Sequence, residues 1–143
     1  MRAWMAVAAA VGVVAASAAC GDKNHKPADD TVACLTAIQD SRGFGAKLGT
    51  SIDAARGAVQ GNATSHYQAM ADAKSYATDW LVKIKDLLGK DISPDLRQTL
   101  TESQTTIEEI QSTLGDATAN PPDATGKLAG IDGNINRVCK GKY

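Results

Sequence analysis

The chain has 143 residues and a formal net charge of −1, from 15 basic and 16 acidic side chains. This balance creates no strong positive field, and no segment carries a basic stripe, so nucleic-acid binding is disfavoured. The length suits one small domain with a single core. Only 4% of the residues are aromatic, and no alternating strand pattern bounded by hairpin turns occurs, which indicates an all-α protein.

Residues 1–19 have the composition of an export signal. Arg2 is followed by an uncharged apolar run from Ala3 to Ala16 and then by three small residues, Ser17, Ala18 and Ala19. A run of ~14 residues spans only ~21 Å as a helix, which is too short to cross a bilayer. We therefore expect residues 1–19 to be a cleaved signal peptide.

Cys20 follows these small residues directly. The segment Ala16-Ser17-Ala18-Ala19-Cys20, with Gly-Asp behind it, resembles the lipobox of bacterial lipoproteins, although Ser17 stands where that family more often has an aliphatic residue. The resemblance implies that Cys20 is linked to diacylglycerol and becomes the mature N-terminus, anchored in the membrane at its extracytoplasmic face. The alternative is an ordinary signal peptide, cut after Ala19 or Ala18, that leaves Cys20 as a plain thiol.

The segment behind Cys20 is polar and charged as far as Asp30 and contains Pro27. This composition predicts a flexible tether. We expect three parts in the chain: the signal peptide, the lipidated cysteine with its tether over residues 20–29, and a bundle domain over residues 30–143.

Four segments of that domain have small or apolar residues at alternating spacings of three and four, the pattern of a helix with one buried face. The positions are Cys34, Ile38, Ser41, Gly45, Leu48, Ile52, Ala55 and Val59 in the first segment, Met70, Ala73, Ala77, Trp80, Ile84 and Leu87 in the second, Leu96, Leu100, Ser103, Ile107, Ile110 and Leu114 in the third, and Ala124, Leu128, Ile131, Ile135 and Val138 in the fourth.

The expected boundaries follow from capping and breaking residues. The first helix runs from Asp30 to about Gly61, with Asp30 or Thr31 as its cap. The second covers about 63–88, and Ser93 caps a third that has Pro94 in its first position and ends at Gly115. The fourth begins beyond 123 and contains Gly126, Gly130 and Gly133, which either form a smooth strip for close helix packing or are tolerated despite their poor helix propensity.

The remaining cysteines are Cys34, near the start of the first helix, and Cys139, near the end of the fourth. Those two ends are neighbours in an up-down-up-down bundle, and an oxidising compartment favours a disulfide between them. A redox-active or metal-binding thiol pair would need close spacing or a histidine partner. We therefore expect an all-α, up-down-up-down four-helix bundle closed by one disulfide.

No catalytic or metal-binding motif is found, and we expect no cofactor. His66 and Met70 are one turn apart, but we assign them to core packing rather than to metal or haem ligation. Tyr67, Tyr76 and Trp80 are candidates for an interaction surface, because aromatic residues are enriched at interfaces. The alternative is that Trp80 fills the core and Tyr76 shields it.

These observations favour a membrane-anchored, non-catalytic binding or accessory module of the bacterial cell envelope, whose partner is another envelope protein. The alternative is a carrier or sensor of a small apolar ligand, bound between the helices where Ser41, Gly45 and Ser103 leave the buried face underfilled. A third possibility is an enzyme whose catalytic residues meet only in the folded chain.

Overall fold

A computed structural model describes residues 27–58, 63–115 and 120–143 of the chain. Within these residues the protein is entirely helical, with four helices and no strand, as expected: α1 (Pro27–Ala58), α2 (Ala63–Leu88), α3 (Pro94–Thr113) and α4 (Thr125–Cys139). The expected signal peptide, Cys20 and residues 21–26 lie outside the described part of the chain. None of the described helices has the length and apolar character that a bilayer crossing requires.

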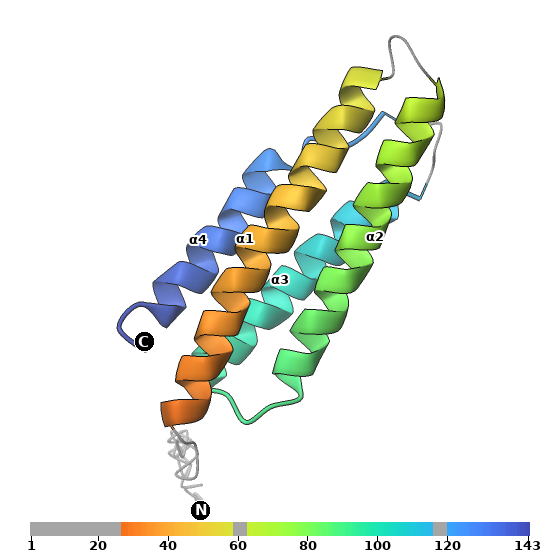
Figure 1. The fold of residues 1–143 in the computed structure, drawn as a ribbon. Coiled ribbons are helices and arrows are strands. Elements are labelled where there is room, and N and C mark those ends of the chain that lie inside the picture. Colours follow the sequence, from red (N-terminus) through yellow and green to blue (C-terminus); the bar gives the residue numbers. More distant parts are fainter. Residues whose placement is uncertain (1–26, 59–62, 116–119) are drawn as a thin grey trace, which may run out of the picture.

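The four helices pack side by side around one core (Figure 1). α1 packs against α2 and α4, and α3 also packs against α2 and α4. The positions expected at the buried face are buried throughout α2 and α3. In α1 and α4 the exceptions are Gly45, Leu128 and Val138, which are half-buried, while Val59 lies outside the described residues.

α1 begins at Pro27, earlier than the expected start at Asp30. Proline fits the first turn because the first amides of a helix have no intrahelical acceptor to lose. Asp29 and Asp30 lie in the same turn, where their charges interact favourably with the helix dipole. Residues 27–29 of the expected tether are therefore helical, and neither Asp30 nor Thr31 is the N-terminal cap.

α3 begins at Pro94 as expected, but its capping differs. Ser93 occupies the cap position without a side-chain hydrogen bond to the helix. Its hydroxyl oxygen instead accepts a hydrogen bond from Lys142 Nζ at 2.9 Å. The Ser93 hydroxyl group thus binds Lys142, 49 residues further along the chain, instead of capping α3.

Trp80 is the largest fully buried side chain and is only 1% exposed. It lies against Gly45 of α1, where an added Cβ would be 3.7 Å from Trp80 Cη2. A Cβ at this distance would make an ordinary van der Waals contact with the indole ring, so Trp80 packs closely against α1 at Gly45 without requiring glycine there.

The glycines of α4 have no such neighbour. Gly126, Gly130 and Gly133 are exposed, and a Cβ added to any of them would meet no other atom within 4 Å. The interpretation of these residues as a strip for close packing is therefore wrong, and α4 tolerates them as residues of low helix propensity.

Candidate functional site

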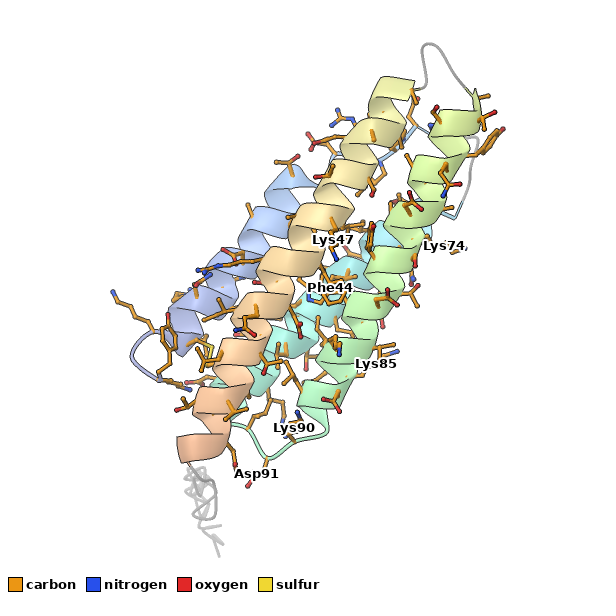
Figure 2. The ribbon with its side chains drawn as sticks, viewed as in Figure 1. Phe44, Lys47, Lys74, Lys85, Lys90 and Asp91 are labelled. Carbon is orange, nitrogen blue, oxygen red and sulfur yellow. A yellow bond between two sulfur atoms is a disulfide. The ribbon has the colours of Figure 1, made fainter. Side chains whose placement is uncertain are left out.

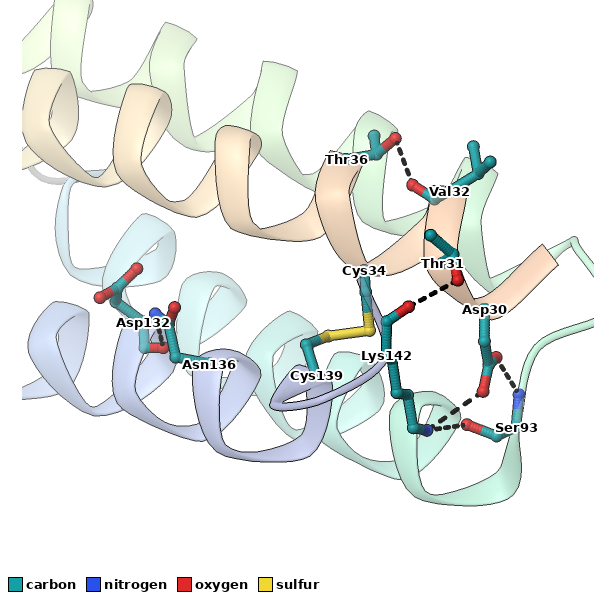
Figure 3. The surroundings of a disulfide bond; sticks show 10 residues. All are labelled: Asp30, Thr31, Val32, Cys34, Thr36, Ser93, Asp132, Asn136, Cys139 and Lys142. Atoms are coloured by element: carbon teal, nitrogen blue, oxygen red, sulfur yellow. Dashed lines mark hydrogen bonds and ion pairs between the residues drawn. A yellow bond between two sulfur atoms is a disulfide. The ribbon is translucent and has the colours of Figure 1, made fainter. Parts of the chain in front are cut away.

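The end of the bundle where α1 begins is closed by the cystine expected from the sequence. The sulfur atoms of Cys34 and Cys139 are 2.07 Å apart, with a Cα–Cα distance of 5.5 Å (Figure 3). Both residues are buried. The bridge joins α1 to the last residue of α4 across 105 positions of sequence.

Beside the disulfide, Asp30, Thr31, Ser93 and Lys142 form a polar group that we call the Asp30 cluster (Figure 3). Lys142 Nζ donates to Asp30 Oδ2 at 3.1 Å and to Ser93 Oγ at 2.9 Å. The Ser93 amide donates to Asp30 Oδ1 at 2.8 Å. Thr31 Oγ1 donates to the carbonyl oxygen of Lys142. These bonds hold the C-terminal segment against the starts of α1 and α3.

The electrostatics of the cluster favour the charged form of Asp30. Burial alone raises the pKa of this carboxyl, but the hydrogen bonds from Ser93 and the ammonium group of Lys142 outweigh it and lower the pKa to about 2. Because both carboxylate oxygens have donors, the buried charge is compensated in the way that a stable internal ion pair requires. The cluster thus supports the fold rather than a reaction.

The three aromatic residues expected to form an interaction surface do not lie on one face. Trp80 is in the core, so its place in that surface is wrong and the alternative role as core filler is confirmed. Tyr67 is 50% exposed, whereas Tyr76 is partly buried against the core. Because these tyrosines are nine residues apart in one helix, they project from opposite sides of it and are separated by ~14 Å along its axis.

Tyr76 belongs to a different site, an open groove between α1 and α2 that we call the Tyr76 groove. It has a volume of about 250 Å³ and is lined by Tyr76 together with Ala46, Lys47, Thr50 and Ser51. Lys47 Nζ lies 5.7 Å from the centre of the Tyr76 ring, which is within cation–π range. Figure 2 shows Lys47 beside Phe44 on the side of α1 next to α2. The groove offers a cation, an aromatic face and two hydroxyl groups to a partner.

Asp40 lies on the same side of α1 as Phe44 and Lys47, about two turns before the lysine. Its Oδ2 atom is buried and has no hydrogen-bond partner, the one such side-chain atom in the described residues. Burial raises the pKa of this carboxyl, and the charge of Lys83 on α2 only partly opposes the rise. Neither Asp40 nor Lys47 was predicted from the sequence, because spacing within one helix does not reveal which residue of a second helix they face.

Each of the three positions that were expected to leave room for a ligand makes a contact within the protein. Trp80 covers Gly45, and Ser41 Oγ donates to Asp132 Oδ1 at 2.8 Å. Ser103 Oγ donates to the carbonyl oxygen of Thr99 at 2.8 Å.

Ser103 also borders a second open groove, of about 200 Å³, between α3 and α4. Within it Lys127 Nζ is 2.8 Å from Glu109 Oε2, so these two charges neutralise each other. The remaining lining residues are Glu102, Thr106, Gly130, Ile131 and Asn134. Unlike the Tyr76 groove, this groove has no aromatic side chain in its lining.

His66 and Met70 are both buried, in keeping with the expected packing role. His66 Nδ1 lies 2.9 Å from the carbonyl oxygen of Ala55, which ties the start of α2 to the end of α1. No group of three or more His, Cys, Asp or Glu residues within the described ranges is arranged to hold a metal ion.

Comparison of the chain with protein-family models, with curated proteins and with solved structures gives no match.

Proposed function

We propose that this protein is an exported, lipid-anchored module of the bacterial cell envelope that binds a protein partner and has no catalytic chemistry of its own. The observation that carries the proposal is the buried Cys34–Cys139 bridge. Structural disulfides persist in oxidising compartments outside the cytoplasm, and residues 1–20 have the pattern that would direct the chain there. The disulfide and the N-terminal sequence thus both support a location outside the cytoplasm.

We further propose an up-down-up-down topology for the bundle. The contact of Asp30 with Ser93 and the bridge from Cys34 to Cys139 support a shared end for the starts of α1 and α3 and the end of α4. The contact of His66 with Ala55 supports a second end, where α1 finishes and α2 starts. Consecutive helices then run in opposite directions.

The Tyr76 groove is the partner-binding site that we propose. Tyrosine and lysine side chains there are accessible from solvent without unfolding, and aromatic residues contribute strongly to protein interfaces. A carrier of small apolar ligands is less well supported, because the hydroxyl groups of Ser41 and Ser103 are hydrogen-bonded within the protein and Trp80 lies against Gly45.

Site-specific photocross-linking in the native envelope tests this assignment. A photoreactive amino acid at Thr50, in the groove, should give one discrete protein adduct that disappears when Tyr76→Ala is added. The matched control is the same amino acid at Thr105, an exposed threonine of α3, which should give no such adduct. An identical adduct from both positions, or none from Thr50, would contradict the assignment.

The anchor itself is tested separately by fractionation. The wild-type protein should sediment with membranes, and Cys20→Ala should move it to the soluble extracytoplasmic fraction. Unchanged membrane association of Cys20→Ala would contradict lipid attachment at this residue.

A further inference from the structure

Exposed apolar side chains gather at the end of the bundle where α1 begins. Val32 is 61% exposed, Leu35 43% and Tyr143 62%. The hydrogen bond from Thr31 to the carbonyl group of Lys142 places Tyr143 beside the first turns of α1. We call Val32, Leu35 and Tyr143 the end patch.

The patch holds three of the five large apolar side chains that are exposed in the described residues; the others, Tyr67 and Val82, are on α2. The Asp30 cluster fixes Lys142, the residue before Tyr143, through three hydrogen bonds. The backbone at Tyr143 therefore starts from a fixed point beside α1.

Chain length links the patch to the proposed lipid anchor. Only residues 21–26 separate the lipid-bearing Cys20 from the start of α1 at Pro27, and the seven steps between these two Cα atoms reach at most about 25 Å when fully extended. α1 has 32 residues, so it is ~48 Å long. The start of α1 therefore remains near the lipid, whereas its far end can be about 70 Å away.

We propose that the end patch lies on the membrane surface and orients the bundle on the lipid; this inference rests on the anchor proposed above. Val32 and Leu35 would enter the boundary between headgroups and acyl chains. Tyr143 has the amphipathic ring that is enriched at membrane–water interfaces. With α1 upright on the membrane, Lys47, 12 residues beyond Leu35, would lie about 18 Å above the patch, with the Tyr76 groove open to a partner.

The charges at this end indicate the character of the contact. Figure 2 shows Lys90 and Asp91 at the end where α1 begins. These two, together with Lys140 and Asp29, are exposed and of both signs. Because opposite charges offset each other there, we infer an apolar contact that persists in high salt rather than an electrostatic one.

The test uses the full lipidated protein in vesicles of phosphatidylcholine and phosphatidylglycerol with brominated acyl chains, which quench nearby tryptophan. Tyr143→Trp should lose emission relative to vesicles without bromine, at low and at high salt. The matched control Tyr67→Trp, an exposed tyrosine on α2, should lose none beyond the wild type, whose Trp80 is buried.

Adding Val32→Asp and Leu35→Asp to Tyr143→Trp should restore the emission, whereas adding Tyr67→Asp should not. Vesicle flotation separates the two proposals. If the protein floats with the vesicles but Tyr143→Trp is not quenched, the membrane-facing patch is wrong and the anchor stands; the patch would then be covered by protein, either a second copy or a partner. If the protein does not float, the anchor is wrong and the patch proposal falls with it.

Discussion

Asp30→Asn should destabilise the protein at neutral pH. It should also reduce the loss of folding free energy that the protein shows as the pH falls. The carboxylate is 8% exposed and 3.1 Å from Lys142 Nζ, and its pKa is about 2 against an ordinary 3.8. This difference corresponds to about 2 kcal/mol of folding free energy, at about 1.4 kcal/mol per pKa unit. Asparagine keeps the shape and one acceptor oxygen but loses the charge.

The direction of the pH dependence follows from the lowered pKa. Because the folded state holds the proton less tightly than the unfolded state, the contribution of Asp30 is fully present above about pH 5 and is lost as the pH falls through 3.8 towards 2. Urea unfolding followed by the fluorescence of Trp80, in a chain starting at residue 20 with Cys20→Ala, measures it. The wild type should lose about 2 kcal/mol more than Asp30→Asn between pH 6 and pH 2.

Asp86→Asn is the matched control. Asp86 Oδ2 is also 3.1 Å from a lysine, Lys90 Nζ, but its side chain is 67% exposed. A solvated pair of this kind contributes less than about 1 kcal/mol, so this variant should follow the wild type across the pH range. Equal pH profiles for the wild type and Asp30→Asn would refute the reasoning, because the buried ion pair would then contribute nothing.

Three further changes test other parts of the fold. Cys34→Ser combined with Cys139→Ser should lower the free energy of unfolding by about 4 to 5 kcal/mol, because the bridge constrains a loop of about 105 residues in the unfolded chain; an unchanged urea midpoint would argue against a structural bridge. Gly130→Ala and Gly133→Ala should each raise this free energy by up to about 1 kcal/mol, since both glycines face open space in α4; a lower Tm would mean that something packs against them. Asp40→Asn should stabilise the protein at pH 7, because the carboxylate is charged with its Oδ2 buried and without a hydrogen-bond partner, whereas asparagine carries no charge to desolvate. Since burial raises the pKa of Asp40, this gain should shrink as the pH falls and the carboxyl becomes protonated, and a gain independent of pH would count against the explanation.

Periodicity alone predicted most of the core. The expected range of α2, about 63–88, coincides with the helix observed. The residues expected on its buried face, from Met70 to Leu87, are all buried. Regular spacing succeeds here because a helix has one repeat, and the face that carries apolar side chains must meet the core.

Helix ends were less predictable because distant residues determine their partners. Asp30 and Ser93 each looked like a cap for the helix that follows in sequence. In the structure both bind Lys142, which lies 112 and 49 positions away respectively. A signal for this was present once the disulfide was expected, because Asp30 precedes Cys34 by about one turn and Lys142 follows Cys139 closely.

The candidate binding site was only partly predictable. Tyr76 was predicted as a candidate interface residue, but its proximity to Lys47 depends on the register between α1 and α2, which spacing along one helix does not specify. The prediction of Trp80 as a surface residue was wrong, although the spacing along α2 pointed to the core. Its position among the regularly spaced buried residues of α2 outweighed the general enrichment of tryptophan at interfaces, and its ring packs beside Gly45 of α1.

The measurement that most directly tests the proposed envelope role is the mass of the N-terminal peptide of the protein purified from bacterial membranes. We predict that this peptide begins at Cys20 and carries the mass of a thioether-linked diacylglycerol. A peptide that begins at an unmodified Cys20, or at any other residue, would contradict the lipid anchor and the orientation on the membrane that depends on it.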